Sequence, residues 1–170
     1  AYHPRDVEKY FKAWNLPTPK IVAASVEGGK NSRHSTGGEV ITDIDVVGAV
    51  VPGARIVVYF GDETTAEELY KIVSTAVLDS ERKPSVISIS WGWPEHDVPK
   101  SILWGMNHLF KKAALLGITI CVASGDNGSL DMDPQSSAAE LNKGKLNVDF
   151  PACLEASLAC GGTWITSKGE

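Results

Sequence analysis

The sequence predicts an α/β fold built on a parallel sheet with helices on both faces. Segments that are apolar at almost every position, at residues 20–26, 54–60 and 118–123, alternate with longer segments whose apolar side chains recur at helical spacing. Strands that are apolar throughout are buried on both faces, and parallel neighbours need a crossover that is usually a helix. Since the pattern begins and ends abruptly, we expect the sheet to be incomplete in this chain.

The first half of the chain predicts two helix–strand pairs. A helix over residues 5–14 is ended by Pro17, and a strand follows at residues 20–26. After a polar loop, we expect a second helix over residues 39–50 and a strand over residues 54–60. The apolar stripe of the second helix consists of Ile41, Ile44, Val47 and Val51.

The second half continues the alternation and adds a long loop. A helix is expected over residues 65–78, with Asp62 and Thr64 as candidate caps at its start. The remaining elements are, in order, a strand at 86–90, a helix at 99–116, a strand at 118–123, a polar loop from 124 to 147 and a short strand at 157–160.

Composition and charge exclude two classes of partner. Hydrophobic residues make up 43% of the chain and charged residues 22%, which is the balance of an ordinary globular protein. The formal net charge is -5, and no stretch dense in Lys and Arg carries interleaved aromatics, so nucleic acid is not an expected partner. No apolar run reaches the length of a membrane span, so a membrane is not expected either.

The three cysteines do not form a metal-binding pattern. Cys121 lies in an apolar run and is expected to be a buried small hydrophobe. Cys153 and Cys160 flank a strand signal, and they can pair with each other or with another chain. Neither a C-x-x-C pair nor a Cys/His cluster occurs, so no zinc site is expected.

The strand ends are where a binding site is expected. Sites in parallel α/β sheets form beyond the carboxyl ends of the strands. Residues 90–95 and 124–129 follow two of the expected strands directly. The loop that precedes Glu39 comes to the same edge if the crossovers are right-handed.

Glu39 and Asp43 are the first candidate pair for proton chemistry. They lie at positions i and i+4 of the expected helix, so their side chains share a face. Where such carboxylates are desolvated, one tends to keep its proton, and the pair becomes a tunable acid and base. The alternative is that both, with Asp45, lie on a solvated helix start where the helix dipole favours negative charge.

Asp126 is a second candidate. It comes after an apolar strand and next to Gly125, in a turn expected to leave little room for solvent. A carboxyl kept neutral in such a place can donate a hydrogen bond to a developing oxyanion. The alternative is an ordinary Asp-Asn-Gly turn.

The segment Ser90-Trp91-Gly92 can extend its strand outward and pair with a peptide laid along it. The alternative is a strand end closed by a buried tryptophan. Among the other polar residues, Asp131 and Asp133 are expected to be solvated, because they have too few partners for calcium. The histidines are expected at the surface, and they are His3, His34, His96 and His108.

Four segments carry a resemblance to a known family. They are GGEVITDIDVVGAVVPGARIVVYF (37–60), SVISISWGWPE (85–95), GITICVASGDNGS (117–129) and VDFPACLEASLACGGT (148–163). Taken together and in this order, they resemble the sedolisins, or serine-carboxyl peptidases, especially the kumamolisin-like branch. The resemblance implies a subtilisin-like α/β fold and cleavage of peptide bonds at acidic pH by a Ser-Glu-Asp triad.

The resemblance also implies roles for individual residues. Glu39 is the general base toward the serine hydroxyl, and Asp43 holds and tunes Glu39. Asp126 matches the protonated aspartate of the oxyanion hole.

For the substrate, the resemblance implies that Ser90, Trp91 and Gly92 pair with the peptide backbone, with Trp91 also near the acidic residues. It places Gly125 and Asp149 along the substrate subsites. Glutamate has a reference pKa of about 4.3, so it can accept the serine proton at a pH where histidine, near 6.5, would be charged.

The serine is missing from this chain. The family's nucleophile lies in a Gly-Thr-Ser stretch, whereas Thr163 is followed here by Trp164. By the resemblance, residues 1–170 are the central part of a single peptidase catalytic domain, with the first strand and the serine-bearing C-terminal part outside this chain. The calcium site of the complete enzyme is expected in that C-terminal part, so no metal site is expected here.

We therefore expect an acid-acting endopeptidase, made as a zymogen and secreted or held in an acidic compartment such as a lysosome. Its expected partners are a protein or peptide substrate and the serine-bearing remainder as a second chain, with a disulfide as one way to join them. The alternative is an inactive relative that keeps a peptide-binding cleft. A flavodoxin-like nucleotide binder is not supported, because neither G-x-G-x-x-G nor G-x-x-x-x-G-K-[ST] occurs.

Overall fold

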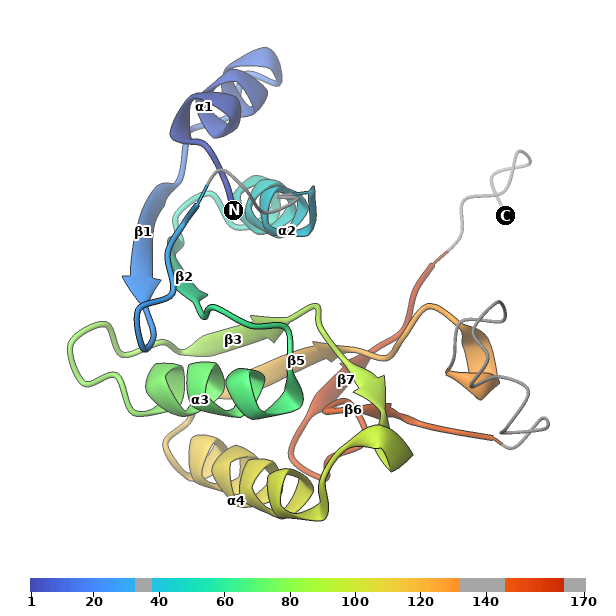
Figure 1. The fold of residues 1–170 in the computed structure, drawn as a ribbon. Helices are drawn as coiled ribbons and strands as arrows, with labels where there is room; N and C mark the ends of the chain where they lie inside the picture. Colours follow the sequence, from blue (N-terminus) through green and yellow to red (C-terminus); the bar gives the residue numbers. More distant parts are fainter. Residues whose placement is uncertain (33–37, 132–145, 164–170) are drawn as a thin grey trace. The chain divides into compact units, whose positions relative to one another are not determined.

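Figure 1 shows the computed structural model of the chain, which describes residues 1–32, 38–131 and 146–163. The chain forms two compact units, residues 1–75 (unit 1) and residues 76–170 (unit 2), and each is described by itself. In the described part, no helix is both long and apolar enough to span a membrane.

Unit 1 contains a two-stranded parallel sheet. Its elements are α1 (Pro4–Ala13), β1 (Lys20–Ser25), α2 (Gly38–Val50), β2 (Arg55–Phe60) and α3 (Ala66–Val77), whose last two residues fall in unit 2. β1 and β2 pair from Lys20 opposite Arg55 to Ser25 opposite Phe60. Parallel neighbours need a crossover, and α2 lies in the connection between these two strands.

The core of unit 1 holds α2 against α1. Val7, Phe11 and Ile44 are at most 1% exposed and form one cluster. Gly48 allows the close approach, because a Cβ there would lie 2.5 Å from the Phe11 ring. The predicted apolar stripe of α2 is confirmed at Ile44 and wrong at Val51, which is 52% exposed just beyond the helix end.

The cap of α3 is not at either predicted residue. The Glu68 amide donates to Thr65 Oγ1 at 3.2 Å, so Thr65 satisfies a backbone donor of the first turn. Asp62 contributes its own amide instead, which donates to the buried Glu68 carboxylate at 3.3 Å. The sequence offers four polar residues in a row before the helix, from Asp62 to Thr65, and only the course of the backbone selects among them.

Unit 2 is built on a three-stranded parallel sheet in the order β3 (Val86–Ile89), β5 (Thr119–Ala123) and β7 (Leu158–Cys160). α4 (Lys100–Leu115) connects β3 to β5 and packs on β5. The short elements are the antiparallel pair β4 (Trp93–Pro94) and β6 (Asp149–Phe150) and the 3-10 turns η1 (Glu95–Asp97) and η2 (Gly128–Leu130).

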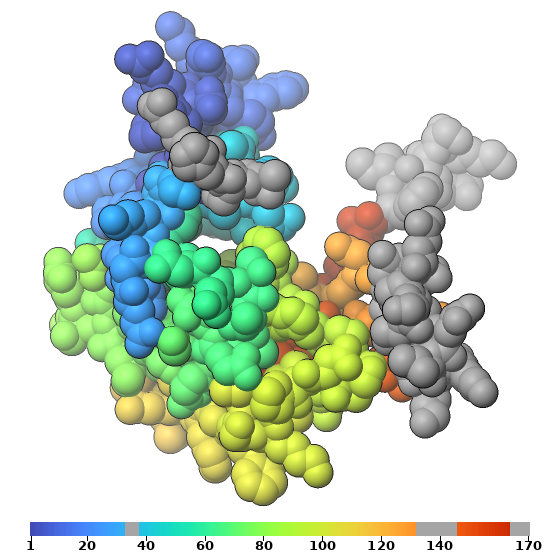
Figure 2. Space-filling view, viewed as in Figure 1, coloured from blue at the N-terminus to red at the C-terminus, as the bar shows by residue number. Residues whose placement is uncertain are grey.

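One face of this sheet is buried within unit 2. Ile120 and Val122 of β5 are at most 2% exposed, and α4 buries Met106, Leu109, Phe110 and Ala113. The opposite side of α4 lies at the surface of unit 2, where Figure 2 shows it in yellow and where Trp104 is 71% exposed.

Alternate positions of the sheet are not covered by unit 2. Val86 is 58% exposed and Leu158 is 56% exposed, although both are large apolar residues at the start of a strand. Cys121 is only half-buried, so the prediction of a fully buried cysteine is wrong. Within unit 2, β3 and β5 therefore bury residues on one face, whereas all three residues of β7 are exposed.

The predicted elements agree closely with the observed ones. Every predicted helix and strand is present, and its ends lie within one residue of those expected. The two-residue strands β4 and β6 were not predicted, because two residues are too short to show any periodicity. Most of the predicted loop at 124–147 lies outside the described residues.

Candidate functional site

Glu39 and Asp43 lie on one face at the start of α2. Glu39 is in the first turn and exposed, and Asp43 is half-buried one turn later. Ile44, next to Asp43 in the chain, is buried in the α1–α2 core. The buried Ile44 side chain thus fixes the helix turn that carries the two carboxylates.

Asp45 adds a third carboxyl to this turn. Its Oδ1 is buried and has no hydrogen-bond partner within the described part of the chain. Burial raises the pKa of Asp45 above its ordinary value. A fully solvated helix start, the alternative weighed for Glu39, Asp43 and Asp45, therefore holds for Glu39 but not for the other two.

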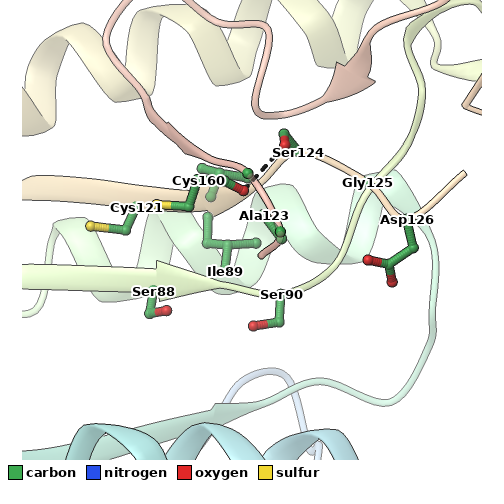
Figure 3. Close-up of a pocket in the computed structure, with 12 residues that line it drawn as sticks. Ser88, Ile89, Ser90, Cys121, Ala123, Ser124, Gly125, Asp126 and Cys160 are labelled. Carbon is green, nitrogen blue, oxygen red and sulfur yellow. Dashed lines mark hydrogen bonds between the residues drawn. The ribbon is translucent and has the colours of Figure 1, made fainter. Parts of the chain in front are cut away.

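The ends of β3 and β5 in unit 2 surround a cavity of about 250 Å³. Figure 3 shows Ser88, Ser90 and Asp126 directed to one side of these strand ends. Ser124 joins β5 to β7, because its amide and its hydroxyl both donate to the Cys160 carbonyl, each at 3.1 Å. The cavity is smaller than typical small-molecule pockets of about 300–1,000 Å³, so it can hold only part of an extended peptide.

Asp126 is exposed, which contradicts the expectation that its turn leaves little room for solvent. It follows Gly125, whose φ of +87° favours glycine. A Cβ at Gly125 would also lie 2.6 Å from Asp131 Oδ1. The turn before Asp126 is thus set by backbone conformation and by a neighbouring carboxyl.

The segment Ser90-Trp91-Gly92 continues from β3, which ends at Ile89. Trp91 is 49% exposed, so the alternative of a strand end closed by a buried tryptophan is wrong. Directly after Gly92, Trp93 pairs with Phe150 and Pro94 with Asp149 in the β4–β6 ladder. This ladder brings Asp149 beneath the segment predicted to meet substrate.

Asp131 and Asp149 form a buried carboxyl pair behind these turns. Asp131 is 6% exposed and Asp149 is 9% exposed, so the prediction of a solvated Asp131 is wrong. Burial, followed by the charges of Asp131 and Asp126, raises the pKa of Asp149 to about 7. Asp131 follows a polar turn and no periodic element, so the sequence carries no signal of its burial.

The thiols form no disulfide. Cys121, Cys153 and Cys160 are all free, so the pairing of Cys153 with Cys160 is not formed. The Cys160 thiol instead lies beside Cys121 and donates to the Leu158 carbonyl at 3.4 Å. Burial and the neighbouring Glu95 raise the pKa of the Cys153 thiol to about 12.

A metal site is not seen in the residues that the structure describes, which contain no group of three or more His, Cys, Asp or Glu side chains able to hold an ion. His3 caps α1, since the Arg5 amide donates to its Nδ1 at 3.2 Å, while His96 and His108 are exposed as predicted. His34 and Asp133 lie outside the described residues.

The fold and the site define a parallel α/β protein with acidic side chains at the ends of its strands. No family model matches the chain. Kumamolisin of Bacillus sp. (strain MN-32) is 40% identical over 172 residues, a match that covers 99% of this chain and 30% of the relative. Physarolisin of Physarum polycephalum is 28% identical and is matched over 98% of this chain and 29% of its own length.

A solved structure has the same fold. Pseudomonas sedolisin (serine-carboxyl proteinase), complexed with two molecules of pseudo-iodotyrostatin, superposes with a TM-score of 0.74 at 24% identity, over 97% of this chain and 46% of that one. The chain belongs to the sedolisin family, as a segment with the family's α/β fold. It spans about a third of the curated relatives it matches, at 30% and 29% of their length.

Proposed function

We propose that this chain is the central part of the catalytic domain of an acid-acting serine-carboxyl endopeptidase. The observation that carries the proposal is the similarity to kumamolisin along 99% of the chain, with Glu39 and Asp43 one turn apart at an accessible helix start. The serine comes from the remainder of the protein, as does the calcium site. No observation favours the alternative of an inactive peptide-binding relative.

In the proposed reaction, Glu39 takes the proton of the serine hydroxyl as the serine oxygen attacks the scissile carbonyl carbon. Asp43 keeps the Glu39 carboxyl in place. The carbonyl electron pair moves to oxygen, where a protonated Asp126 donates a hydrogen bond to it. Glu39 then passes its proton to the leaving amine as the C–N bond breaks, and water repeats the sequence on the acyl-enzyme.

The substrate is proposed to lie as an extended strand along Ser90, Trp91 and Gly92, with Gly125 and Asp149 lining its subsites. The exposure of Trp91 and the cavity at the ends of β3 and β5 support this position. Asp126 is fully effective as a donor only while protonated, so activity is expected to fall toward neutral pH. We accordingly place the whole protein outside the cell or in an acidic compartment.

The test uses the full-length protein that contains this chain. Glu39→Gln removes the base and keeps the shape, and it is expected to lower kcat by about 10²–10⁴. Glu67→Gln is the matched control, because Glu67 is also an exposed glutamate in the first turn of a helix. Near-normal peptide cleavage by Glu39→Gln between pH 3 and pH 7 would contradict the assignment.

A further inference from the structure

We propose that Cys121 and Cys160 form a site for one thiophilic metal ion that takes two ligands, such as Cu(I) or Hg(II), at the cavity of unit 2. The ion bridges β5 to β7 through one bond to each sulfur atom, and it blocks the cavity to a peptide. The second part of the inference rests on the proposed function, because the same cavity is assigned there to the substrate.

The register of the sheet puts both thiols on one face. β5 and β7 pair with Cys121 opposite Leu158 and with Ala123 opposite Cys160. Side chains alternate along a strand, so Cys121 and Ala123 project from the same face, and Cys160 projects from it beside Ala123. Figure 3 shows the two sulfur atoms near each other, and the Cys160 thiol acts on Cys121 by its charge and by hydrogen bonding. The two cysteines are thus diagonal neighbours on adjacent strands.

The spacing of diagonal neighbours suits a bridging ion and not a disulfide. The Cα atoms of such neighbours lie about 7–8 Å apart. A disulfide joins Cα atoms that are usually about 4.4–6.8 Å apart, through an S–S bond of about 2.05 Å. Both thiols are free, in agreement with this difference. Two metal–sulfur bonds of about 2.3 Å each let the sulfur atoms stay up to about 4.6 Å apart, so an ion joins them without a shift of the strands.

The donor atoms select a soft metal ion. Thiolates favour soft ions such as Cu(I), whereas calcium takes at least about six oxygen ligands and structural zinc takes about four ligands. Among the described residues that line the cavity, Asp126 is the one carboxyl. Within the same part of the chain, no group of three or more His, Cys, Asp or Glu side chains can hold a metal. Two thiols alone therefore match an ion that is satisfied by two ligands.

The two thiols differ in access to solvent, which orders the binding steps. Cys160 is exposed and Cys121 is half-buried, so Cys160 meets the ion first and Cys121 closes the bridge. Burial, followed by the neighbouring Cys160, raises the pKa of the Cys121 thiol, so the ion must displace a proton from it. With Hg(II), two S–H bonds break, two S–Hg bonds form and two protons leave to solvent, and neither sulfur changes its oxidation state.

The position of the site connects it to substrate binding. Cys121 and Cys160 line the cavity of about 250 Å³ together with Ser90, Gly125 and Asp126. The proposed function assigns the latter three to the peptide backbone, a subsite and the oxyanion. Because the cavity is small enough to hold only part of a peptide, a bridging ion takes space that the peptide needs. A thiophilic ion is therefore expected to inhibit a peptidase whose nucleophile is a serine.

The experiment treats the full-length protein with mercuric acetate and compares the wild type with Cys121→Ala and Cys160→Ala. Cys153→Ala is the matched control, because Cys153 is the third cysteine of the chain and does not line the cavity. Intact mass and peptide mapping are expected to show one mercury gained and two hydrogens lost at Cys121 and Cys160 in the wild type and in Cys153→Ala. Neither of the other two variants should hold this bridge.

Peptide cleavage by the same proteins measures the inhibition, each relative to its own untreated rate. The mercury concentration that halves the rate is expected to rise about 10²-fold or more in Cys121→Ala and in Cys160→Ala, because the second of two linked bonds is lost. It should stay at the wild-type value in Cys153→Ala. If Cys121→Ala does not fold, Cys160→Ala decides, since the Cys160 side chain is exposed.

Binding and inhibition are judged separately. The site is overturned if the bridged mercury is lost in Cys153→Ala, if it survives in Cys121→Ala and Cys160→Ala, or if untreated protein contains a Cys121–Cys160 disulfide. A bridge that forms in the wild type without lowering its rate overturns the block of the substrate. If the wild type cleaves no peptide at any pH, the proposed function fails, and the metal site is judged on the mass measurements, which need no catalysis.

Discussion

The start of α2 in unit 1 and the strand ends of unit 2 both carry carboxyl groups, but they hold them in opposite ways. At α2, Glu39 is exposed, and an apolar core of Phe11 and Ile44 fixes the helix beneath it. At the strand ends, Asp131 and Asp149 are buried, and they pack directly on glycine main chain. The first arrangement leaves a carboxylate in contact with solvent, whereas the second keeps two carboxyl groups away from it.

The difference shows that proximity of acids does not by itself define their chemistry. Glu39 and Asp43 share a helix face with access to solvent, so they suit proton transfer to a substrate. Asp149, with a pKa raised to about 7 by burial and by like charges, suits a structural role that depends on pH. Burial, more than spacing, separates the two.

The largest loss of stability is expected from removing the Phe11 ring, which packs on α2 beneath Glu39. Phe11→Ala leaves a cavity under Gly48 and Ile44, and it is expected to destabilise the full-length protein by about 3–5 kcal/mol. Urea unfolding measures the loss. Trp14→Ala is the control, because Trp14 is 68% exposed and should change stability by about 0.5 kcal/mol or less. Equal losses in the two variants would show that the α1–α2 core does not support Glu39.

The next effect concerns the pH dependence of stability. The folded-state pKa of Asp149 is raised from 3.8 to about 7, so its contribution is fully present below pH 4 and is lost as pH rises toward 7. The loss specific to Asp149 is expected to be on the order of a few kcal/mol, read as the difference between wild type and Asp149→Asn in denaturant titrations. A difference of the opposite sign, with stability gained toward pH 7, would mean that Asp149 is paired with a positive group.

A smaller effect is expected where glycine meets the buried pair. Gly125→Ala introduces a Cβ close to Asp131 Oδ1 at a position with φ of +87°. Gly128→Ala has a similar conformational cost, at φ of +61°, but its Cβ would meet nothing within 4 Å. We expect Gly125→Ala to lose about 1–3 kcal/mol more than Gly128→Ala in thermal unfolding. Equal losses of stability in the two variants would mean that backbone strain alone explains the cost. They would contradict tight packing of Gly125 on Asp131.

The smallest effect is expected at the cap of α3, where the structure uses a different residue from those that the sequence pattern offered. Thr65→Ala removes the oxygen that accepts the Glu68 amide and is expected to cost about 1 kcal/mol of unfolding free energy. Thr64→Ala, at one of the two residues that the sequence pattern offered as caps, is expected to cost a few tenths of a kcal/mol of unfolding free energy. Reversed costs would show that α3 begins one residue earlier than the structure has it.

Local patterns were sufficient for the secondary structure and for part of the site. The apolar runs and helical spacings placed every long element to within one residue, because each carries several residues of periodic signal. The pair Glu39 and Asp43 followed from spacing on one helix, and the family followed from motif order. The roles of Glu39, Asp43 and Asp126 remain predictions.

Other features depended on residues that are distant in the chain. The short strand β6 exists only because β4 pairs with it, and this pairing places Asp149 under Gly92. Asp131 has no periodic neighbours, and its burial results from the turn that packs on Gly125. In the same way, only the packing of unit 2 left Asp126 and Trp91 exposed.

The sequence alone therefore determined the alternation of helices and strands, the candidate base with its partner, and the family. The tertiary structure decided which carboxyls are solvated, which keep a proton and which glycines they touch. The physical reason is that periodicity reports local backbone conformation, whereas the energy of a carboxyl depends on solvent and charges brought to it by segments far away in the chain.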